Sequence, residues 1–230
     1  MHPRNEQTIG TMFDRIAPRY DFLNRLLSLR QDQHWRKVML SLSPTTEKGS
    51  FLDVATGTGD VLLEALKRRQ NYGEFVGCDI SRGMLELAAR KIPQDPRVRL
   101  EVASAEKLPF SESHFHCVTI AFGLRNVINK ERTLKEFFRV LKPGGRLMIL
   151  EFFTPRQTLF AKAFLFYFQR ILPLIGGLLS DRQAYAYLPE SVGTFYLAPE
   201  LKDKLTTTGY SHIQERSFLF GACRLIIADK

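Results

Sequence analysis

From Ser50 onward, short apolar runs alternate with stretches of helical periodicity. The runs at residues 51–55, 75–79, 98–103, 117–122 and 147–151 are predicted as strands, and four of them are apolar enough for central positions. Residues 61–69, 84–92 and 133–141 have helical spacing, and the last ends at a Lys-Pro-Gly-Gly turn over residues 142–145. This order is typical of βαβ units, so an α/β fold with a mostly parallel sheet is expected.

Three segments lie outside this alternation. Residues 213–220 and 223–228 predict a terminal antiparallel hairpin across Gly221 and Ala222, and residues 1–48 show helical periodicity. The most apolar stretch, residues 158–179, is interrupted by charges, Pro173 and a pair of glycines, so it is not typical of a spanning helix. It suits a core helix, a lid over an apolar substrate or a membrane-facing helix, and the sequence leaves these open.

Length and cysteine content bound the class of protein. A chain of 230 residues can bury a core without disulfides. Cys78, Cys117 and Cys223 are odd in number and lie in apolar runs, which indicates buried thiols in a reducing compartment. The polar N-terminus shows no signal or transit peptide, so a cytoplasmic protein is expected.

A glycine-rich turn follows the first predicted strand. Residues 53–60 read Asp-Val-Ala-Thr-Gly-Thr-Gly-Asp, and Gly57 and Gly59 let a ligand approach the backbone beside helix N–H groups. No Gly-Lys-Ser/Thr follows, which excludes a Walker loop. A dinucleotide fingerprint would carry a third glycine where Leu62 stands. The turn therefore favours a nucleoside without a pyrophosphate.

Two further turns follow the second and third strands. Asp79, twenty residues beyond Gly59, is placed to accept hydrogen bonds from both hydroxyls of a ribose. In residues 104–110, Ser104 and backbone groups are placed to contact an adenine edge. Because ligands of open α/β sheets bind at the carboxyl ends of the strands, the three turns predict S-adenosylmethionine as cofactor.

Longer motifs make a family resemblance specific. Ala-Glu-Lys-Leu-Pro-Phe at 105–110, Phe-Gly-Leu-Arg-Asn at 122–126 and Arg-Val-Leu-Lys-Pro-Gly-Gly at 139–145 resemble class I methyltransferases of the ubiquinone/menaquinone biosynthesis C-methyltransferase family. Tyr20, Asp21, Asn24, Ser28 and Trp35 resemble that family's first signature.

The resemblance implies one doubly wound, Rossmann-like α/β domain over residues 1–230, mostly parallel with the C-terminal antiparallel hairpin. Its expected parts are an N-terminal helical cap (1–48), a cofactor-binding core (49–151), a helical substrate lid (152–200) and the hairpin region (201–230). The implied reaction moves a methyl group from S-adenosylmethionine to a ring carbon of a polyprenylated quinol. Demethylmenaquinol is the favoured substrate, and the corresponding benzoquinol of the ubiquinone pathway is the alternative. A homodimer is also among the expected states.

The expected site residues fall into three sets. The cofactor set is Asp53, Gly57, Thr58, Gly59, Asp79, Ile80, Ser104, Ala105 and Ala121. The substrate set is Tyr20, Asn24 and Phe122, although packing is the favoured role of Tyr20 and Trp35. Arg125 and Asn126 are the catalytic candidates, with structural hydrogen bonding as the alternative; the arginine stays protonated and would stabilise a quinolate or orient a water. No metal site is expected, since His114 and His116 have no third ligand nearby.

The chain departs from the family pattern at three places. Asp32 stands where the first signature has a histidine, and Ala121 replaces a serine that contacts the cofactor. Residues 139–151 resemble the family's second signature, which ends in Glu-x-Ser, whereas Phe152 and Phe153 follow Glu151 here. These changes leave Asp79 and the glycine turn in place. They bear on substrate fit and remove one cofactor contact.

The positive charge admits several partners. With 33 Lys and Arg against 24 Asp and Glu, the net charge is +9, which suits nucleic acid, an anionic membrane or an acidic ligand. No zinc site or recognition helix favours nucleic acid, so a nucleic-acid methyltransferase stays a remote alternative behind a lipid or sterol methyltransferase. Residues 1–40 and 152–182 each carry a net +3, outside the expected core, and this predicts peripheral contact with an anionic membrane.

Overall fold

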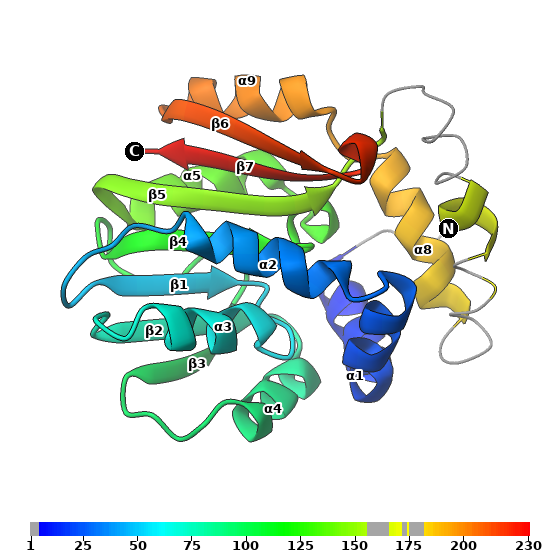
Figure 1. Ribbon diagram of the computed structural model, residues 1–230, viewed down its shortest axis with the longest axis horizontal. Helices are drawn as coiled ribbons and strands as arrows, with labels where there is room; N and C mark the ends of the chain where they lie inside the picture. The colour runs from blue at the N-terminus through cyan, green and yellow to red at the C-terminus, as the bar shows by residue number, and fades with distance from the viewer. Residues whose placement is uncertain (1–4, 156–165, 172–173, 175–181) are drawn as a thin grey trace.

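The computed structural model describes residues 5–155, 166–171, 174 and 182–230. In this part of the chain, seven strands form one sheet in the order β3-β2-β1-β4-β5-β7-β6 (Figure 1). They are β1 (Ser50–Val54), β2 (Glu74–Asp79), β3 (Val98–Val102), β4 (Phe115–Ala121), β5 (Leu141–Phe152), β6 (Ser211–Phe218) and β7 (Cys223–Asp229). β1 to β5 pair in parallel, whereas β7 pairs antiparallel with β5 and β6. The predicted α/β sheet and its terminal hairpin are confirmed.

Helices cover both faces of the sheet. The described helices are α1 (Glu6–Leu27), α2 (Gln31–Ser41), α3 (Asp60–Arg68), α4 (Arg82–Lys91), α5 (Lys130–Val140), α8 (Arg182–Gly193) and α9 (Ala198–Thr208), with shorter turns η1 (Leu124–Asn126), η2 (Tyr167–Ile171) and η3 (Leu219–Gly221). None of these combines the length and the apolarity needed to cross a membrane.

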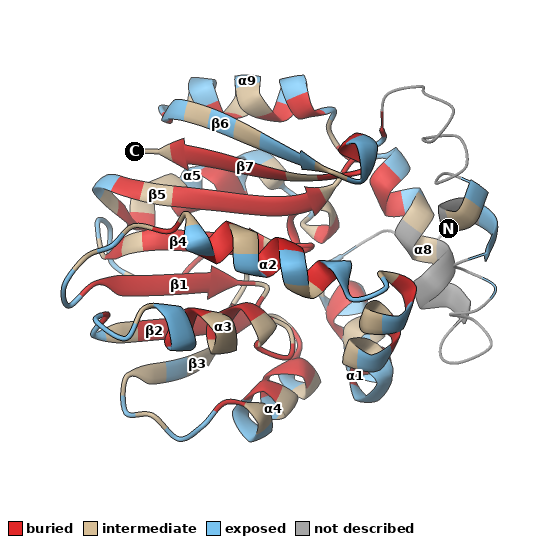
Figure 2. Cartoon of the chain, in the orientation of Figure 1, coloured by how far each residue is buried: buried red, intermediate tan, exposed pale blue. Residues whose placement is uncertain are grey.

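Two apolar cores result from the alternation of side chains along the strands. On β5, Leu147 and Ile149 pack with α5 and α9, while Met148 and Leu150 pack with α2 and α3. Successive strand residues point to opposite faces, so a near-continuous apolar run fills both cores at once. Figure 2 shows β1, β4, β5 and β7 buried over most of their length. The three cysteines are buried and free, as the sequence indicated.

β5 is longer than its apolar run. It begins at Leu141, and the predicted turn of residues 142–145 lies inside it as an irregularity: Phe115 pairs with Leu141, and the register resumes at Cys117 and Arg146. Gly144 has a φ of +74°, a conformation that glycine adopts without strain. The predicted helix stop is confirmed, since α5 ends at Val140, but residues 142–145 belong to the strand, which continues through them as a bulge.

The N-terminal periodicity corresponds to α1 and α2. α1 contacts α4 and α8 at the end of the sheet where the parallel strands finish, while α2 crosses the face that carries α3 (Figure 1). Trp35 on α2 is 2% exposed and belongs to the core below it. Most of the apolar segment 158–179 lies outside the described residues.

Candidate functional site

A cavity lies at the carboxyl ends of the parallel strands, beneath α1. Its walls come from α1, from the turns after β1 to β4, and from the start of α4. They are formed by Glu6, Ile9, Phe13, Tyr20, Val54, Ala55, Gly57, Asp79, Ile80, Met84, Ala103, Ala105, Ala121, Phe122, Gly123, Asn126 and Val127. Small and apolar groups dominate this wall, and few polar groups converge on it, which is typical of a nucleoside pocket.

Gly57 and Asp79 form the polar end of the cavity. The Gly57 N–H donates to Asp79 Oδ2 at 2.8 Å, and the Ser81 N–H donates to Asp79 Oδ1 at 2.9 Å. Gly57 has a φ of +55°, and no atom lies within 4 Å of where its Cβ would stand. Burial raises the pKa of Asp79, although these backbone donors favour its charged form. Each carboxylate oxygen keeps acceptor capacity, so both can bind hydroxyls of a ribose.

Three other residues of the predicted cofactor set support the loop and do not line the cavity. Asp53 accepts hydrogen bonds from Thr56 Oγ1 at 2.6 Å and Thr119 Oγ1 at 2.7 Å, and its burial raises the pKa of the carboxyl to about 7. Gly59 packs closely against the end of α4: a Cβ there would lie 3.2 Å from Ala88 Cβ and 2.8 Å from Cδ1 of Ile92, the residue that follows the helix. Thr58 Oγ1 donates to Asp21 Oδ1 at 2.5 Å and so faces α1.

The third turn meets the first residue of α1. Ser104 Oγ donates to Glu6 Oε1 and accepts a hydrogen bond from the Glu106 N–H at 3.0 Å. Ala105 lines the cavity beside this contact, while Ser104 does not. Of the remaining predicted cofactor residues, Ile80 and Ala121 line the cavity. Ala121 presents only a methyl group there, as the departure from the family pattern implied.

α1 closes the cavity from above. Ile9, Phe13 and Tyr20 point into it from one helix face. Asn24 lies four residues beyond Tyr20 and hydrogen-bonds with it, so the predicted pair shares a face. Burial raises the pKa of Tyr20, and the positive charges of Arg125 and Arg36 oppose this rise.

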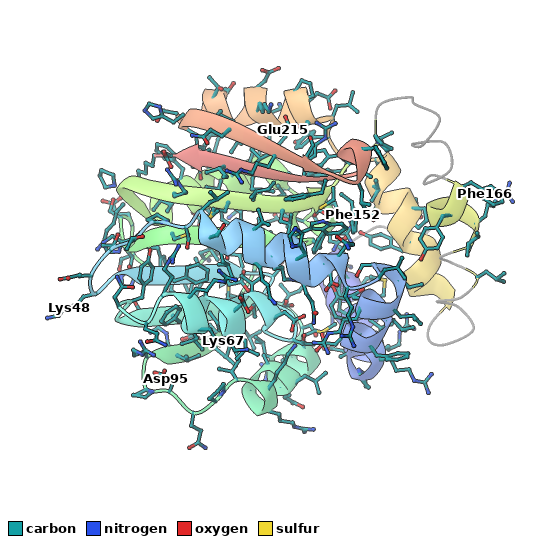
Figure 3. The ribbon with its side chains drawn as sticks, in the orientation of Figure 1. Lys48, Lys67, Asp95, Phe152, Phe166 and Glu215 are labelled. Atoms are coloured by element: carbon teal, nitrogen blue, oxygen red, sulfur yellow. The ribbon has the colours of Figure 1, made fainter. Side chains whose placement is uncertain are left out.

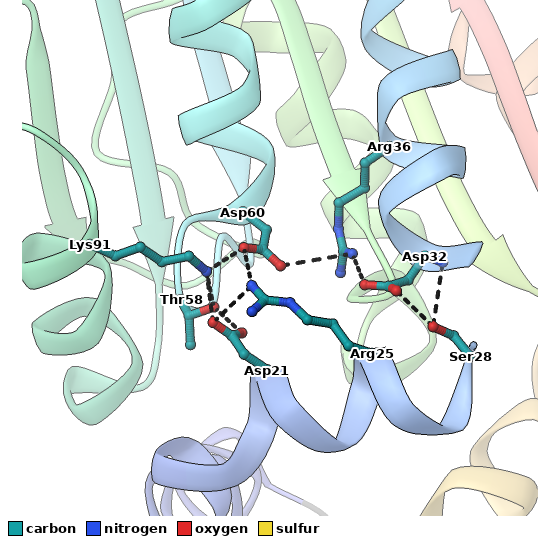
Figure 4. A network of polar contacts seen from close by, with 8 residues as sticks. All are labelled: Asp21, Arg25, Ser28, Asp32, Arg36, Thr58, Asp60 and Lys91. Carbon is teal, nitrogen blue, oxygen red and sulfur yellow. Dashed lines mark hydrogen bonds and ion pairs between the residues drawn. The ribbon is translucent and has the colours of Figure 1, made fainter. Parts of the chain in front are cut away.

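A cluster of charged side chains fastens α1 to the core (Figure 4). We call it the clasp; it comprises Asp21, Arg25, Ser28, Asp32, Arg36, Thr58, Asp60 and Lys91. Lys91 Nζ lies 2.7 Å from Asp21 Oδ2 and also pairs with Asp60, while Arg25 Nη2 lies 3.4 Å from Asp60 Oδ1.

Two features of the clasp affect its charge. Asp32, the residue that stands in place of the family's histidine, pairs with Arg36 and accepts from Ser28 Oγ at 2.6 Å. Burial opposes ionisation of Asp60, but the charges of Arg36, Lys91 and Arg25 outweigh it and lower the pKa. Asp60 therefore stays ionised at neutral pH.

Arg125 and Asn126 lie in η1, directly after β4. The Arg125 side chain is 8% exposed, with Nη1 2.8 Å from Oε1 of the fully buried Glu151 and also donating to the Phe122 carbonyl. Asn126 lines the cavity, and its buried Oδ1 has no hydrogen-bond partner among the described residues. An unpaired buried acceptor facing a cavity indicates a donor on the bound ligand.

The histidines and cysteines take structural positions. His114 Nε2 lies 2.7 Å from Glu74 Oε2, and His116 Nδ1 accepts from the Ser50 N–H at 3.0 Å. Burial raises the pKa of Cys78, Cys117 and Cys223. Within the part of the chain that the structure describes, no three such groups are placed to hold a metal ion.

The sequence missed the polar ties of α1. Asp14 Oδ1 accepts from Ser81 Oγ at 2.6 Å and from the Gly83 N–H at 3.0 Å, and Glu6 reaches Ser104. No local pattern marks these residues, because their partners are about 70 to 100 positions away in the chain. Asp21 lies in the motif that resembles the family's first signature, and this motif is the sequence feature that points to the clasp.

The fold and cavity define a class I methyltransferase with a nucleoside pocket at the carboxyl edge of its sheet. A solved methyltransferase of Thermotoga maritima is similar in fold, with a TM-score of 0.69, 18% identity, and coverage of 96% of this chain and 99% of that one. The model of the ubiE/COQ5 methyltransferase family matches residues 1–230, and the chain belongs to this family.

Two curated relatives are similar over nearly the whole chain. The ubiquinone/menaquinone biosynthesis C-methyltransferase UbiE of Geobacter sulfurreducens is 45% identical over 227 residues, covering 97% of this chain and 89% of the relative. The demethylmenaquinone methyltransferase of Thermus thermophilus is 44% identical, covering 95% of this chain and 100% of the relative. The enzyme is thus an S-adenosylmethionine-dependent methyltransferase. The cavity fits that cofactor, with Asp79 and Gly57 at a polar end and small side chains beside it.

Proposed function

We propose that this enzyme methylates a ring carbon of a polyprenylated quinol, with demethylmenaquinol as its substrate. One observation carries the proposal: a single cavity combines the ribose-binding geometry of Asp79 and Gly57 with an apolar, aromatic wall at Phe13, Tyr20 and Phe122. The names of the relatives support the substrate class. The demethylated benzoquinol of the ubiquinone pathway is the alternative substrate.

The bound cofactor supplies a sulfonium methyl group that is already activated for in-line displacement. The protein must hold the quinol ring against it and exclude water. Asp79 and Gly57 fix the nucleoside, and Ala121 and Phe122 lie at the end of β4. α1 covers the opening with Tyr20 in the cavity wall, while Asn24 does not line the cavity and acts through its hydrogen bond to Tyr20. The role of each of these residues can be tested by a single substitution.

Arg125 and Asn126 are the proposed catalytic residues. A ring carbon becomes nucleophilic when a neighbouring hydroxyl loses its proton, so a fixed cation beside that hydroxyl stabilises the developing quinolate. Arg125 does not line the cavity itself, and in this proposal its cation acts from behind the wall that Phe122 and Asn126 form. Asn126 supplies an unpaired acceptor at that wall. Arg125→Ala should lower kcat by about 100-fold, the scale of removing one electrostatic stabiliser. Calorimetry should show unchanged cofactor affinity; unchanged turnover would exclude Arg125 from the mechanism.

The substrate assay compares two quinols with tails of equal length. Labelled S-adenosylmethionine is supplied with reduced demethylmenaquinol or with the demethylated benzoquinol, and the methylated product is quantified. We expect demethylmenaquinol to be methylated with the higher kcat/KM. Cofactor binding without methylation of either quinol would contradict the substrate class and favour a lipid or sterol methyltransferase.

The proposed location is the cytoplasm, where a peripheral enzyme can reach a quinol whose tail stays in a bilayer. The division into cap (1–48), core (49–151), lid (152–200) and hairpin region (201–230) belongs to the same proposal, as does a homodimer. Sedimentation of the purified enzyme against concentration tests the homodimer directly.

A further inference from the structure

Glu6 is the first residue of α1, and its side chain is part of the cavity wall. Ser104 Oγ donates a hydrogen bond to Glu6 Oε1, so the turn after β3 fixes the position of the carboxylate. The second oxygen, Oε2, has no hydrogen-bond partner among the residues that the structure describes. A carboxylate that is held through one oxygen can accept a hydrogen bond from a ligand at the other.

The order of the strands indicates which part of the cofactor lies beside Glu6. In the order β3-β2-β1-β4, Asp79 at the end of β2 stands between the turn after β3 and the turns after β1 and β4. On the β3 side, Ala103 and Ala105 present small apolar surfaces that suit the faces of a flat purine. Base and sulfonium are attached at opposite ends of a ribose. With the ribose at Asp79, the base therefore extends toward β3 and Glu6, and the sulfonium toward β1 and β4.

The other polar side chains of the cavity wall lie elsewhere. Among the described residues these are Tyr20, Asp79 and Asn126. Asp79 faces the ribose, and Asn126 follows β4 on the opposite side of the cavity. Tyr20 lies about four helical turns beyond Glu6 on α1, close enough to Arg125 and Arg36 for their charges to lower its pKa. Glu6 is thus the polar side chain of the wall at the end that receives the base.

The polar groups next to Glu6 in the turn after β3 already have partners. Glu106 Oε1 accepts from the Asn129 N–H at 2.8 Å, and the Glu106 N–H donates to Ser104 Oγ at 3.0 Å. Ser104 donates its hydroxyl proton to Glu6 and does not line the cavity. The sequence assigned the adenine edge to Ser104, whereas the structure brings the partner of Ser104 to that edge. We propose that Glu6 Oε2 accepts a hydrogen bond from the 6-amino group of adenine, so that α1 selects the base of the cofactor.

The proposed contact discriminates between purines. Adenine carries a hydrogen-bond donor at position 6, whereas hypoxanthine carries a carbonyl oxygen there. A carboxylate accepts from the amino group and repels the carbonyl oxygen, and a site built around one donor rejects the analogue that lacks it. The proposal concerns the cofactor alone and does not depend on the identity of the methylated substrate.

The experiment is calorimetric titration of the full-length enzyme with S-adenosylhomocysteine and with S-inosylhomocysteine, its 6-oxo analogue. The wild type should bind S-adenosylhomocysteine at least about tenfold more tightly. In Glu6→Gln, Ser104 keeps the amide oxygen and Nε2 takes the place of Oε2, so a donor then faces position 6. The preference of this variant should fall to about onefold or reverse. Glu86→Gln on the exposed face of α4 removes the same charge away from the cavity wall and should keep the wild-type preference.

A second variant separates base recognition from the attachment of α1. Ser104→Ala removes the hydroxyl that holds Glu6 but keeps the carboxylate, so both ligands should bind less tightly by about threefold while the preference for adenine stays. If Glu6 only fastens the helix, Glu6→Gln will weaken both ligands by the same factor, and that constant ratio would overturn the proposal. Loss of the preference in Ser104→Ala with its retention in Glu6→Gln would return the contact to Ser104, and a wild type that binds both ligands equally would also refute the assignment.

Discussion

Arg125 has a fixed position because Glu151, Phe122 and Ser191 each accept a hydrogen bond from its side chain. Glu151 Oε2 also accepts from the Arg125 N–H at 3.1 Å, so one fully buried carboxylate holds both the side chain and its loop. A buried cation without its partner is costly and tends to move. Glu151 is therefore a positioning residue for the arginine, and its removal tests how far turnover depends on that position.

Glu151→Gln should lower kcat more than it raises KM, because it disturbs the cation and leaves the cavity wall in place. Breaking a buried pair costs about 3–5 kcal/mol, so urea unfolding should also show a lower free energy of unfolding. The exposed pair of Glu131 and Lys204 gives the control: Glu131→Gln should change neither turnover nor stability measurably. A kcat that stays at the wild-type value in soluble Glu151→Gln enzyme would remove the positioning role.

Asp53 makes stability depend on pH in a defined direction. Its pKa is raised from 3.8 to about 7 in the folded protein, so the folded state binds a proton that the unfolded state has released. Its contribution to stability is fully present below pH 3.8 and is lost as pH rises toward 7. An amide at this position cannot titrate, so the free energy of unfolding of the wild type minus that of Asp53→Asn should fall between about pH 4.5 and about pH 8. Urea titrations at both values measure it, and a constant difference would show that Asp53 is not perturbed.

Sequence can bring residues together on paper where they follow directly from strand ends. Asp79, Gly57, Ile80, Ala105 and Ala121 all line one cavity, because parallel strands bring their carboxyl ends to one edge; their role in binding the cofactor stays a prediction. Asp53, Thr58 and Gly59 share the same motif but support the loop instead of facing the cavity. A sequence motif marks a loop that must keep its shape, and it does not separate the residues that touch a ligand from those that hold the loop.

At the scale of elements, α1 is held at both ends and covers the cavity between them. Glu6 and Asp14 tie its first half to the turns after β3 and β2, and the clasp ties its second half to α3 and α4. Because cofactor must pass α1 to enter or leave, the clasp should control the rate of exchange. Figure 4 places Lys91 between two carboxylates of different elements, which makes it the most informative single change.

Lys91→Met should accelerate release of S-adenosylhomocysteine by about three- to tenfold, the effect of losing a part-buried ion pair of about 1 kcal/mol. Stopped-flow displacement measures the rate. Lys67→Met on the exposed face of α3, labelled in Figure 3, is the control and should leave it unchanged. Since the pKa of Asp60 is lowered, its contribution to stability is present above the unfolded pKa of 3.8 and is lost only as pH falls through the folded value. The release rate should therefore show no clasp-dependent change between about pH 5.5 and about pH 8.

Helix boundaries were predictable to within two or three residues. The helices over 61–69 and 84–92 correspond to α3 and α4 within two residues, since apolar spacing and caps are local signals, whereas the helix over 133–141 was predicted to start three residues after α5 begins. β5 begins six residues before its apolar run, because backbone pairing with β4 continues through the Lys-Pro-Gly-Gly turn. Hydrogen-bonded partners of distant strands leave no mark in the local sequence.

For the whole molecule, the sheet order and the two-sided core follow from the alternation of strands and helices, whereas the placement of α1 depends on contacts across the fold. The cavity has walls from the core and from α1, so a bound cofactor contacts both. A ligand that binds only the closed, folded form lowers the population of open forms by mass action. Because the ligand contacts both α1 and the strand ends, local opening of either should become rarer once the site is filled.

Hydrogen exchange with and without S-adenosylhomocysteine tests this coupling. Backbone amides of α1 should gain protection together with those at the ends of β1, β2 and β4, because opening of α1 then requires loss of the ligand. Amides of α9 and β6 have no residue in the cavity wall and should exchange at equal rates in both states. Protection confined to the strand ends would mean that α1 moves independently of the filled cavity, and the clasp would then hold the helix without controlling access to the cofactor.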